Sequence, residues 1–196
     1  ILDSLEAAGN LALEIDENAT ITNTTTVDIE GTIGENLTVT AQTGAITDSG
    51  PLSVGALGTF QTLDGSDITL DNAGNTFGSV IIDGGAVTLT ESDDTVLVDV
   101  LADTLAVASG GNITEVADAT VSVAGVASLS AASGSSDITL LESNNDFGSL
   151  ELTASNASIL EQDDMQLDFV DAASVDLTAT GGVTDGTEID ILVTGD

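Results

Sequence analysis

The chain has 196 residues, of which 41% are hydrophobic, and this is enough for one or two domains with a buried core. It carries 34 Asp and Glu residues and no Lys, Arg or His, so no salt bridge between side chains can form and no side chain can neutralise a phosphate group. This composition excludes electrostatic binding to nucleic acids or anionic membrane surfaces, and it favours cations, neutral surfaces or sugars as partners.

The beginning of the chain holds the one hint of helical periodicity. Leu2, Leu5 and Leu13 are separated by Ala and Glu, so a helix over residues 2–13 is an alternative to the strands that we expect elsewhere. The chain starts at Ile1 without the pattern of a signal peptide, and no apolar run approaches the roughly 18 residues needed to cross a bilayer. We expect a segment of a longer chain that does not insert into membranes.

From Asn18 to Thr184 a short marker recurs, in which a small or turn-forming residue precedes an aliphatic residue and often Thr. The spacing of about 19 to 26 residues is that of one turn of a solenoid. The aliphatic residues of the markers are Ile21, Ile46, Ile68, Val87, Ile113, Ile138, Ile159 and Val183.

Short segments between the markers alternate apolar and polar residues with period 2 and are rich in Val, Leu and Thr, which is typical of strands. These segments are residues 37–40, 87–89, 96–100, 121–123, 150–152 and 175–178. The one proline, Pro51, cannot donate to a strand ladder, so we expect it at a turn or corner.

A longer repeat lies above this short one. Residues 67–94 recur without a gap at 137–164, and Phe77-Gly78-Ser79 returns as Phe147-Gly148-Ser149. We interpret each unit of about 70 residues as three solenoid turns. The expected organisation is a single solenoid over 1–196, with repeats at approximately 45–110 and 112–181.

One turn of about 22 residues cannot fold alone, because ordering its backbone costs more free energy than burying five or six aliphatic side chains contributes. Stacked turns overcome this by pairing each strand with its equivalents above and below. We therefore predict an all-β fold, a right-handed parallel β-helix with about 22 residues per turn and roughly 8–9 turns, forming a rod roughly 40 Å long. Further repeats, or end-to-end or lateral homo-assembly, would cover its open ends.

Two stretches carry a resemblance to a known family: GAITDSGPLSVG at Gly44–Gly55 and DITLDNAGNTFGS at Asp67–Ser79. They resemble the degenerate repeats of filamentous-haemagglutinin-like large exoproteins, over roughly Asn18 to Thr184. The resemblance implies a β-helical rod at a bacterial surface, exported by two-partner or autotransporter-type secretion. It also implies a mechanical role in adhesion or extracellular matrix, with glycans or proteins of host or neighbouring cells as partners. The lack of basic residues departs from typical members and argues against heparin-like ligands.

Acidic clusters at equivalent positions of the long repeat are candidate Ca²⁺ sites, since Ca²⁺ takes six to eight oxygen ligands. The candidate ligands are Glu91, Asp93, Asp94, Glu161, Asp163 and Asp164, and a further pair is Asp16 and Glu17. The sequence has neither an EF-hand loop nor a calcium-binding nonapeptide. The simpler interpretation is that these carboxylates keep the rod soluble, and we expect no other cofactor.

Two alternatives to a passive rod remain. Divalent ions that bridge acidic rods would make the protein a Ca²⁺-dependent surface or sheath filament. Parallel β-helices also include polysaccharide-active enzymes, in which a pair such as Asp93 and Asp94 could act as acid and base. Such sites also use Arg, Lys or His, which are absent here, so we expect no enzymatic activity.

Two further expectations concern polar side chains. The Asn pairs Asn72/Asn75 and Asn144/Asn145 are expected to form turns or stacked-amide ladders. Crowded carboxylates repel one another, which raises their pKa values in the folded state. Stability should therefore increase as the pH falls from 7 toward about 5.

Overall fold

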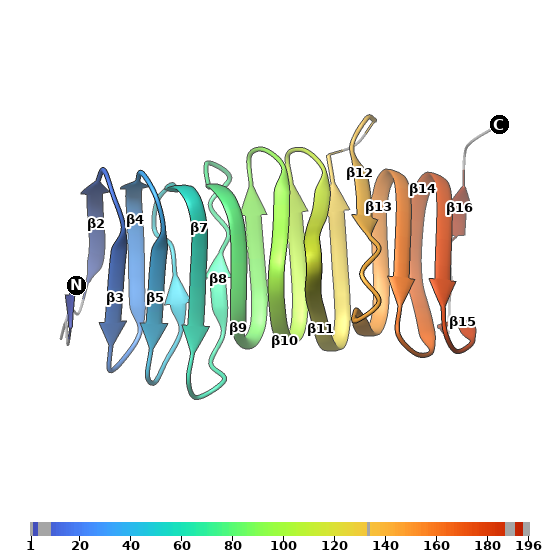
Figure 1. The fold of residues 1–196 in the computed structure, drawn as a ribbon, viewed down its shortest axis with the longest axis horizontal. Coiled ribbons are helices and arrows are strands. Elements are labelled where there is room, and N and C mark those ends of the chain that lie inside the picture. Colours follow the sequence, from blue (N-terminus) through green and yellow to red (C-terminus); the bar gives the residue numbers. More distant parts are fainter. Residues whose placement is uncertain (1, 4–8, 133, 187–190, 194–196) are drawn as a thin grey trace.

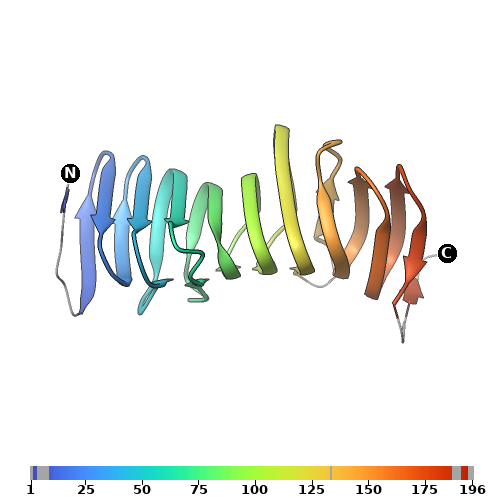
Figure 2. The same ribbon diagram turned by 90° about the horizontal axis from the view of Figure 1, so that it is seen from below.

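The protein is an elongated coil of stacked strands, shown from two directions in Figures 1 and 2. The computed structural model describes residues 2–3, 9–132, 134–186 and 191–193. The described residues contain strands and turns but no helix, and accordingly none that could span a membrane. The strands are β1 (Leu2–Asp3), β2 (Asn10–Ile15), β3 (Ala19–Asn23), β4 (Val27–Ile33), β5 (Leu37–Ala41), β6 (Ile46–Thr47), β7 (Leu52–Thr62), β8 (Ile68–Leu70), β9 (Thr76–Glu91), β10 (Thr95–Ser109), β11 (Ile113–Ala131), β12 (Asp137–Leu140), β13 (Asp146–Glu161), β14 (Met165–Ala179), β15 (Val183–Asp185) and β16 (Ile191–Val193).

All strand pairs of the described residues are parallel, and each strand inside the stack bonds to its counterparts one turn before and one turn after it. The result is a β-solenoid of about nine turns, which confirms the predicted fold class. Paired residues are separated by 17 positions between Val80 and Leu97 and by 25 between Ile113 and Ile138. A spacing of about 19 describes the solenoid, somewhat shorter than the expected 22.

The core is a set of aliphatic rows that run along the rod. In the longest row every side chain is buried and pairs with its neighbour in the next turn. This row is Val27, Ile46, Ile68, Val87, Leu105, Ala127, Leu150 and Leu167. Burying one Val, Leu or Ile side chain contributes about 1.5 to 3 kcal/mol, and here that burial exists only because turns stack.

The helix considered over residues 2–13 is wrong where the structure describes it, because β2 (Asn10–Ile15) is a strand that pairs with β4. Leu11, Leu13 and Ile15 alternate with exposed residues and pack against the core, so period 2 prevails there. Leu5 lies outside the described residues. Pro51 stands between the bend at Ser49–Gly50 and the start of β7, so it lies at a turn as predicted.

The long repeat spans about three and a half turns instead of the three that we expected. Ile68 leads through its paired residues to Val87, Leu105, Ala127 and then Leu150. Ala127 and Leu150 lie three and four turns after Ile68 in this row. Position 138, the equivalent of position 68, lies about midway between them in the sequence. The markers were misleading because Val87 pairs with Leu105 and not with the next marker. Equivalent residues of the two repeats consequently lie about half a turn apart around the rod.

Candidate functional site: two buried corner networks

Buried and half-buried polar side chains gather where one turn stacks on the next, at equivalent corners of the two repeats. In the first repeat the N–H of Ser92 donates to the carbonyl of Asn75 (2.9 Å), and in the second the N–H of Gln162 donates to the carbonyl of Asn145 (2.9 Å). We call these sites the first and second corner networks. The first consists of Asp48, Asn75 and Glu91, and the second of Glu115, Asn145 and Glu161.

Asn75 is fully buried at the centre of the first corner network. Its Oδ1 accepts the N–H of Leu52 (2.8 Å), and its Nδ2 donates to Oδ2 of Asp48 (2.5 Å). The Asp48 carboxylate also accepts the N–H groups of Asp71 (3.0 Å) and Asn72 (3.2 Å). The amide and the carboxylate together satisfy backbone donors that no strand pairs, which buried backbone groups require.

The second corner network repeats this arrangement with one substitution. Asn145 is fully buried, its Oδ1 accepts the N–H of Val121 (3.2 Å) and its Nδ2 donates to Oε1 of Glu115 (3.1 Å). Glu115, in the place of Asp48, also accepts the N–H of Glu142 (2.6 Å). These Asn side chains thus bond to backbone and carboxylate groups instead of forming the stacked-amide ladder that we considered.

A buried glutamate completes each network. Glu91 is 3% exposed and Glu161 is 0% exposed. Oε1 of Glu91 accepts the N–H of Phe77 (2.8 Å), and Oε1 of Glu161 accepts the N–H of Phe147 (3.0 Å). The second oxygen of each carboxyl, Oε2, is buried and has no hydrogen-bond partner among the described residues. Each glutamate therefore needs a proton, or a ligand, that these contacts do not supply.

Burial raises the pKa of both Glu91 and Glu161 to about 7, although the N–H groups that bond to them act in the opposite direction. Burial also raises the pKa of Asp48 and of Glu115. Repulsion from neighbouring carboxylates contributes less than burial does at all four positions. The expected rise in pKa therefore arises here first from desolvation and only second from crowding.

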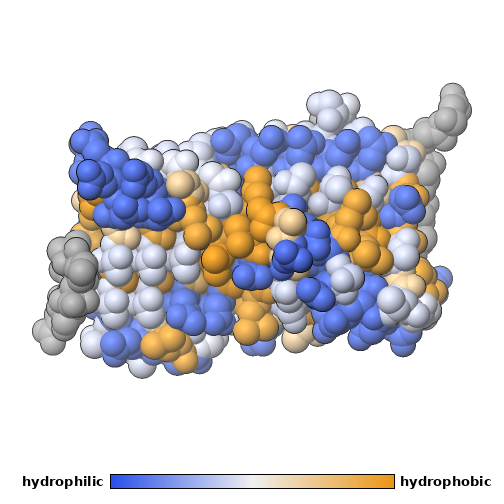
Figure 3. All heavy atoms as spheres, in the orientation of Figure 1, coloured by the Kyte–Doolittle hydropathy of each residue, from blue (hydrophilic) through white to orange (hydrophobic). Residues whose placement is uncertain are grey.

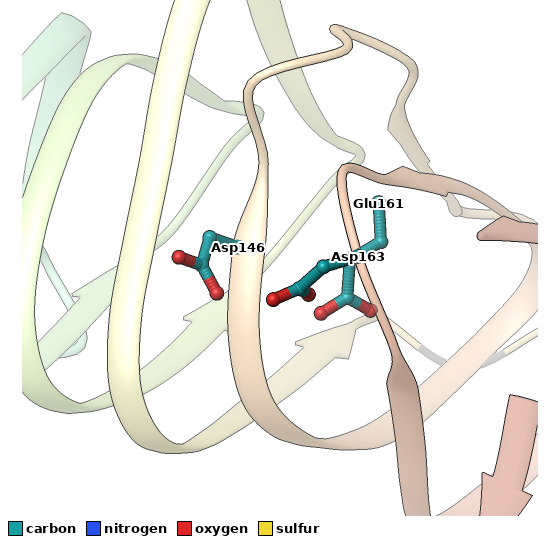
Figure 4. A group of neighbouring side chains, drawn as sticks. All are labelled: Asp146, Glu161 and Asp163. Carbon is teal, nitrogen blue, oxygen red and sulfur yellow. The ribbon is translucent and has the colours of Figure 1, made fainter. Parts of the chain in front are cut away.

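Among the six candidate Ca²⁺ ligands, Glu161 and Asp163 come together, and Asp146 joins them (Figure 4). One carboxylate oxygen from each lies within 4.8 Å of the other two. Sequence reasoning missed Asp146, because only the 17-residue turn brings it beside Asp163. Its signal was the exchange of Thr76 for Asp146 between Asn75–Ser79 and Asn145–Ser149, which otherwise match.

The other candidates lie apart from this group. Oδ1 of Asp94 accepts the N–H of Asn112 (2.7 Å), and Oδ1 of Asp164 accepts the N–H of Gly182 (2.7 Å), so both carboxylates bind the backbone of the next turn. Asp93 is exposed. In the described ranges, the candidates of the first repeat take part in no group of three close carboxylates.

The remaining polar candidates are turn residues. Asp16 and Glu17 are exposed between β2 and β3. Oδ1 of Asn72 accepts the N–H of Gly74 (3.0 Å), which is the turn role expected for it. A single stacked amide pair occurs elsewhere, where Nδ2 of Asn36 donates to Oδ1 of Asn18 in the preceding turn (2.8 Å).

Comparisons with known proteins agree with the repetitive architecture. A family model described as "Repeats of unknown function (DUF5649)" matches residues 16–83 and 84–154, two consecutive segments that together cover more than half of the chain. A search among curated proteins found no match. A search among solved structures found none either.

Proposed function

We propose, since the chain belongs to the family of repeats of unknown function (DUF5649), that its function is structural: stacked repeats form a stiff rod that extends and spaces other parts of an assembly. The continuous ladder of parallel strands carries this proposal. Successive turns bond to one another through the backbone, and those between Val27 and Leu167 share a buried aliphatic row. Such a rod resists bending and stretching because many hydrogen bonds must break together.

The place of this rod is, in our proposal, outside the cell or on its surface, in an exoprotein that mediates adhesion or builds an extracellular matrix. The resemblance of Gly44–Gly55 and Asp67–Ser79 to haemagglutinin-like repeats supports this. The charge of −34 also supports it, because an acidic rod stays dispersed in solution. On the face shown in Figure 3, hydrophilic residues form a band along one long edge and apolar residues lie in the middle, which suits contact with neutral surfaces.

Electron microscopy of the purified segment in EDTA tests the structural role. Single rods of about 40 Å, the length set by stacking at the strand spacing, support it, and fusing two copies in tandem should lengthen the rod. Compact particles would contradict it. Binding of the rod to cells and to arrays of neutral glycans then tests adhesion, and matrix formation is the expected role if nothing binds.

A second candidate is a filament or sheath whose rods are bridged by divalent cations. The observation that favours it is the complete lack of basic residues, because acidic rods repel one another unless cations lie between them. Filaments that form with about 5 mM CaCl₂, dissolve in EDTA and do not form with NaCl of equal ionic strength would establish this candidate.

A further inference from the structure

We propose that Asp146, Glu161 and Asp163 form a specific calcium site in the second corner network, and that the first repeat lacks this site. The site would hold one ion within a single chain, where it joins the start of β13 to the turn that follows β13. It does not depend on the mechanical role proposed above, nor on the bridging of neighbouring rods.

The spacing of the three carboxylates fits calcium. Calcium binds oxygen at about 2.3 to 2.6 Å, so two ligand atoms of one ion lie at most about 5 Å apart. One oxygen from each of Asp146, Glu161 and Asp163 lies within 4.8 Å of the other two. Magnesium is less suitable because it prefers to keep its water ligands.

The unpartnered buried oxygen of Glu161 points to a ligand because two further carboxylates lie close to this side chain, whereas the equally unpartnered oxygen of Glu91 lies in no such group among the described residues. Glu161 is 0% exposed, its Oε1 is held by the N–H of Phe147, and its Oε2 has no hydrogen-bond partner among the residues described. Figure 4 shows the Glu161 carboxylate between those of Asp146 and Asp163. The chain has no Lys, Arg or His that could neutralise this group, so the charge that balances three close carboxylates has to come from outside the chain.

The two flanking carboxylates keep oxygens free for an ion. Asp146 is half-buried, and its Oδ2 accepts a hydrogen bond from Nε2 of Gln162 (3.1 Å), which orients the carboxylate. Asp163 is exposed, so water can reach the group and complete a shell of six to eight oxygens. A buried ligand, an oriented ligand and an open side together make a plausible coordination shell for a hard cation.

The first repeat offers a natural contrast at the equivalent corner. Thr76 stands in place of Asp146, and its hydroxyl donates to Oγ of Ser53 (2.9 Å). The Thr95 hydroxyl lies beside the Glu91 carboxyl, so a neutral Glu91 has a polar neighbour there. The second repeat has Met165 at that position, which has no hydroxyl. Glu161 thus has the Asp146 carboxylate nearby, whereas the first repeat has Thr76 at that position and the Thr95 hydroxyl beside Glu91.

Calorimetric titration with CaCl₂ at constant ionic strength, set with NaCl, tests the proposal. We expect one saturable ion per wild-type chain and an affinity lowered about tenfold or more in Asp146→Thr, which installs the residue of the first repeat. The matched control is Asp103→Thr, which removes the same charge from an exposed position of β10 and should bind as the wild type does. Thr76→Asp should add a second ion.

Line broadening by substoichiometric Mn²⁺ in NMR spectra locates the ion. Amide signals of Phe147 and Gln162 should broaden before those of Phe77 and Ser92. Asp146→Asn, which keeps the shape of the side chain, serves if Asp146→Thr does not fold. Two results would overturn the proposal. One is Ca²⁺ binding that does not saturate and that Asp146→Thr and Asp103→Thr reduce equally. The other is line broadening that is spread evenly over both corners. These outcomes are separate from rod length and filament formation, which test the proposed function.

Discussion

The two corner networks share a backbone framework and differ in what surrounds their glutamates. Each has a buried Asn that accepts a backbone N–H, and each has a Glu whose Oε1 is held by the N–H of a Phe. Beside Glu91 stands the hydroxyl group of Thr95, and beside Glu161 stand two further carboxylates. The shared hydrogen bonds hold the corner of the turn. The side chains that differ between the repeats determine whether the buried carboxyl is kept neutral or has its negative charge balanced by a cation.

The largest expected loss of stability comes from removing the buried Asn that both corner networks share. Asn75→Ala and Asn145→Ala each leave a buried backbone N–H without a partner and remove one hydrogen bond from a half-buried carboxylate, so each should lower the free energy of unfolding by about 2 to 4 kcal/mol. Urea denaturation measures both values, and they should agree because the lost bonds correspond. The neighbouring exposed Asn144→Ala is the control, with an expected change within about 0.5 kcal/mol. Equal effects of Asn144→Ala and Asn145→Ala would refute a structural role for the buried amide.

A smaller effect comes from the titration of Glu91. Its pKa in the folded protein is about 7, above the ordinary value of 4.5, so the folded state binds more protons than the unfolded state between these values. The stability contributed is fully present below about pH 4.5 and is lost as the pH rises through about 7. Between pH 8 and pH 5, Glu91 should therefore contribute a gain of roughly 2 to 3 kcal/mol.

Glu91→Gln should remove this part of the pH dependence, whereas the exposed Glu14→Gln should keep it. Urea denaturation of the three proteins in EDTA at pH 5 and pH 8 gives the comparison. If Glu91→Gln retains the whole slope of the wild type, the slope arises from repulsion across the acidic surface instead of from this buried carboxyl.

The smallest expected loss of stability distinguishes the hydrogen bonds of Asp67 from those of Asp137, its equivalent in the second repeat. Asp137 accepts both the N–H (3.1 Å) and the Nδ2 group (2.7 Å) of Asn156, whereas Asp67 accepts the N–H of Ala86 alone (3.0 Å). Asp137→Ala should cost about 1 kcal/mol and Asp67→Ala about 0.5 kcal/mol, because these bonds are near the surface. The midpoints of urea denaturation measure the difference, and a larger loss in Asp67→Ala would contradict this assignment of the bonds.

Period-2 segments and recurring markers were enough to predict the class of fold, because apolar alternation and stacking leave few other arrangements. Register was harder to predict. Val87 and Ile113 carry the same marker but belong to different rows, since Val87 pairs with Leu105. An error of a few residues in the assumed length of each turn shifts the predicted pairing of every later strand. Asp146 could therefore not be placed beside Asp163 from the sequence.

The stacking register also determines which of the candidate Ca²⁺ ligands lie together and which lie apart. Glu161, Asp163 and Asp164 are close in sequence and chemically alike, yet only Glu161 and Asp163 come together, whereas Asp164 bonds to Gly182 in the next turn. Side chains on successive residues of a strand or turn diverge, so proximity in the sequence does not make a common site. The burial of Asn75 and Asn145 also lacked a sequence signal, because Asn is more often found at exposed turns.

The advance of about three and a half turns per repeat has a geometric consequence. Copies of any repeated feature therefore lie alternately on two opposite sides of the rod. A feature returns to the same side after two repeats, which is about seven turns. A repeat of a whole number of turns would instead line up its copies on one side. Neighbours that recognise the same feature would thus approach consecutive repeats from opposite directions, and one rod could hold two of them without competition between them.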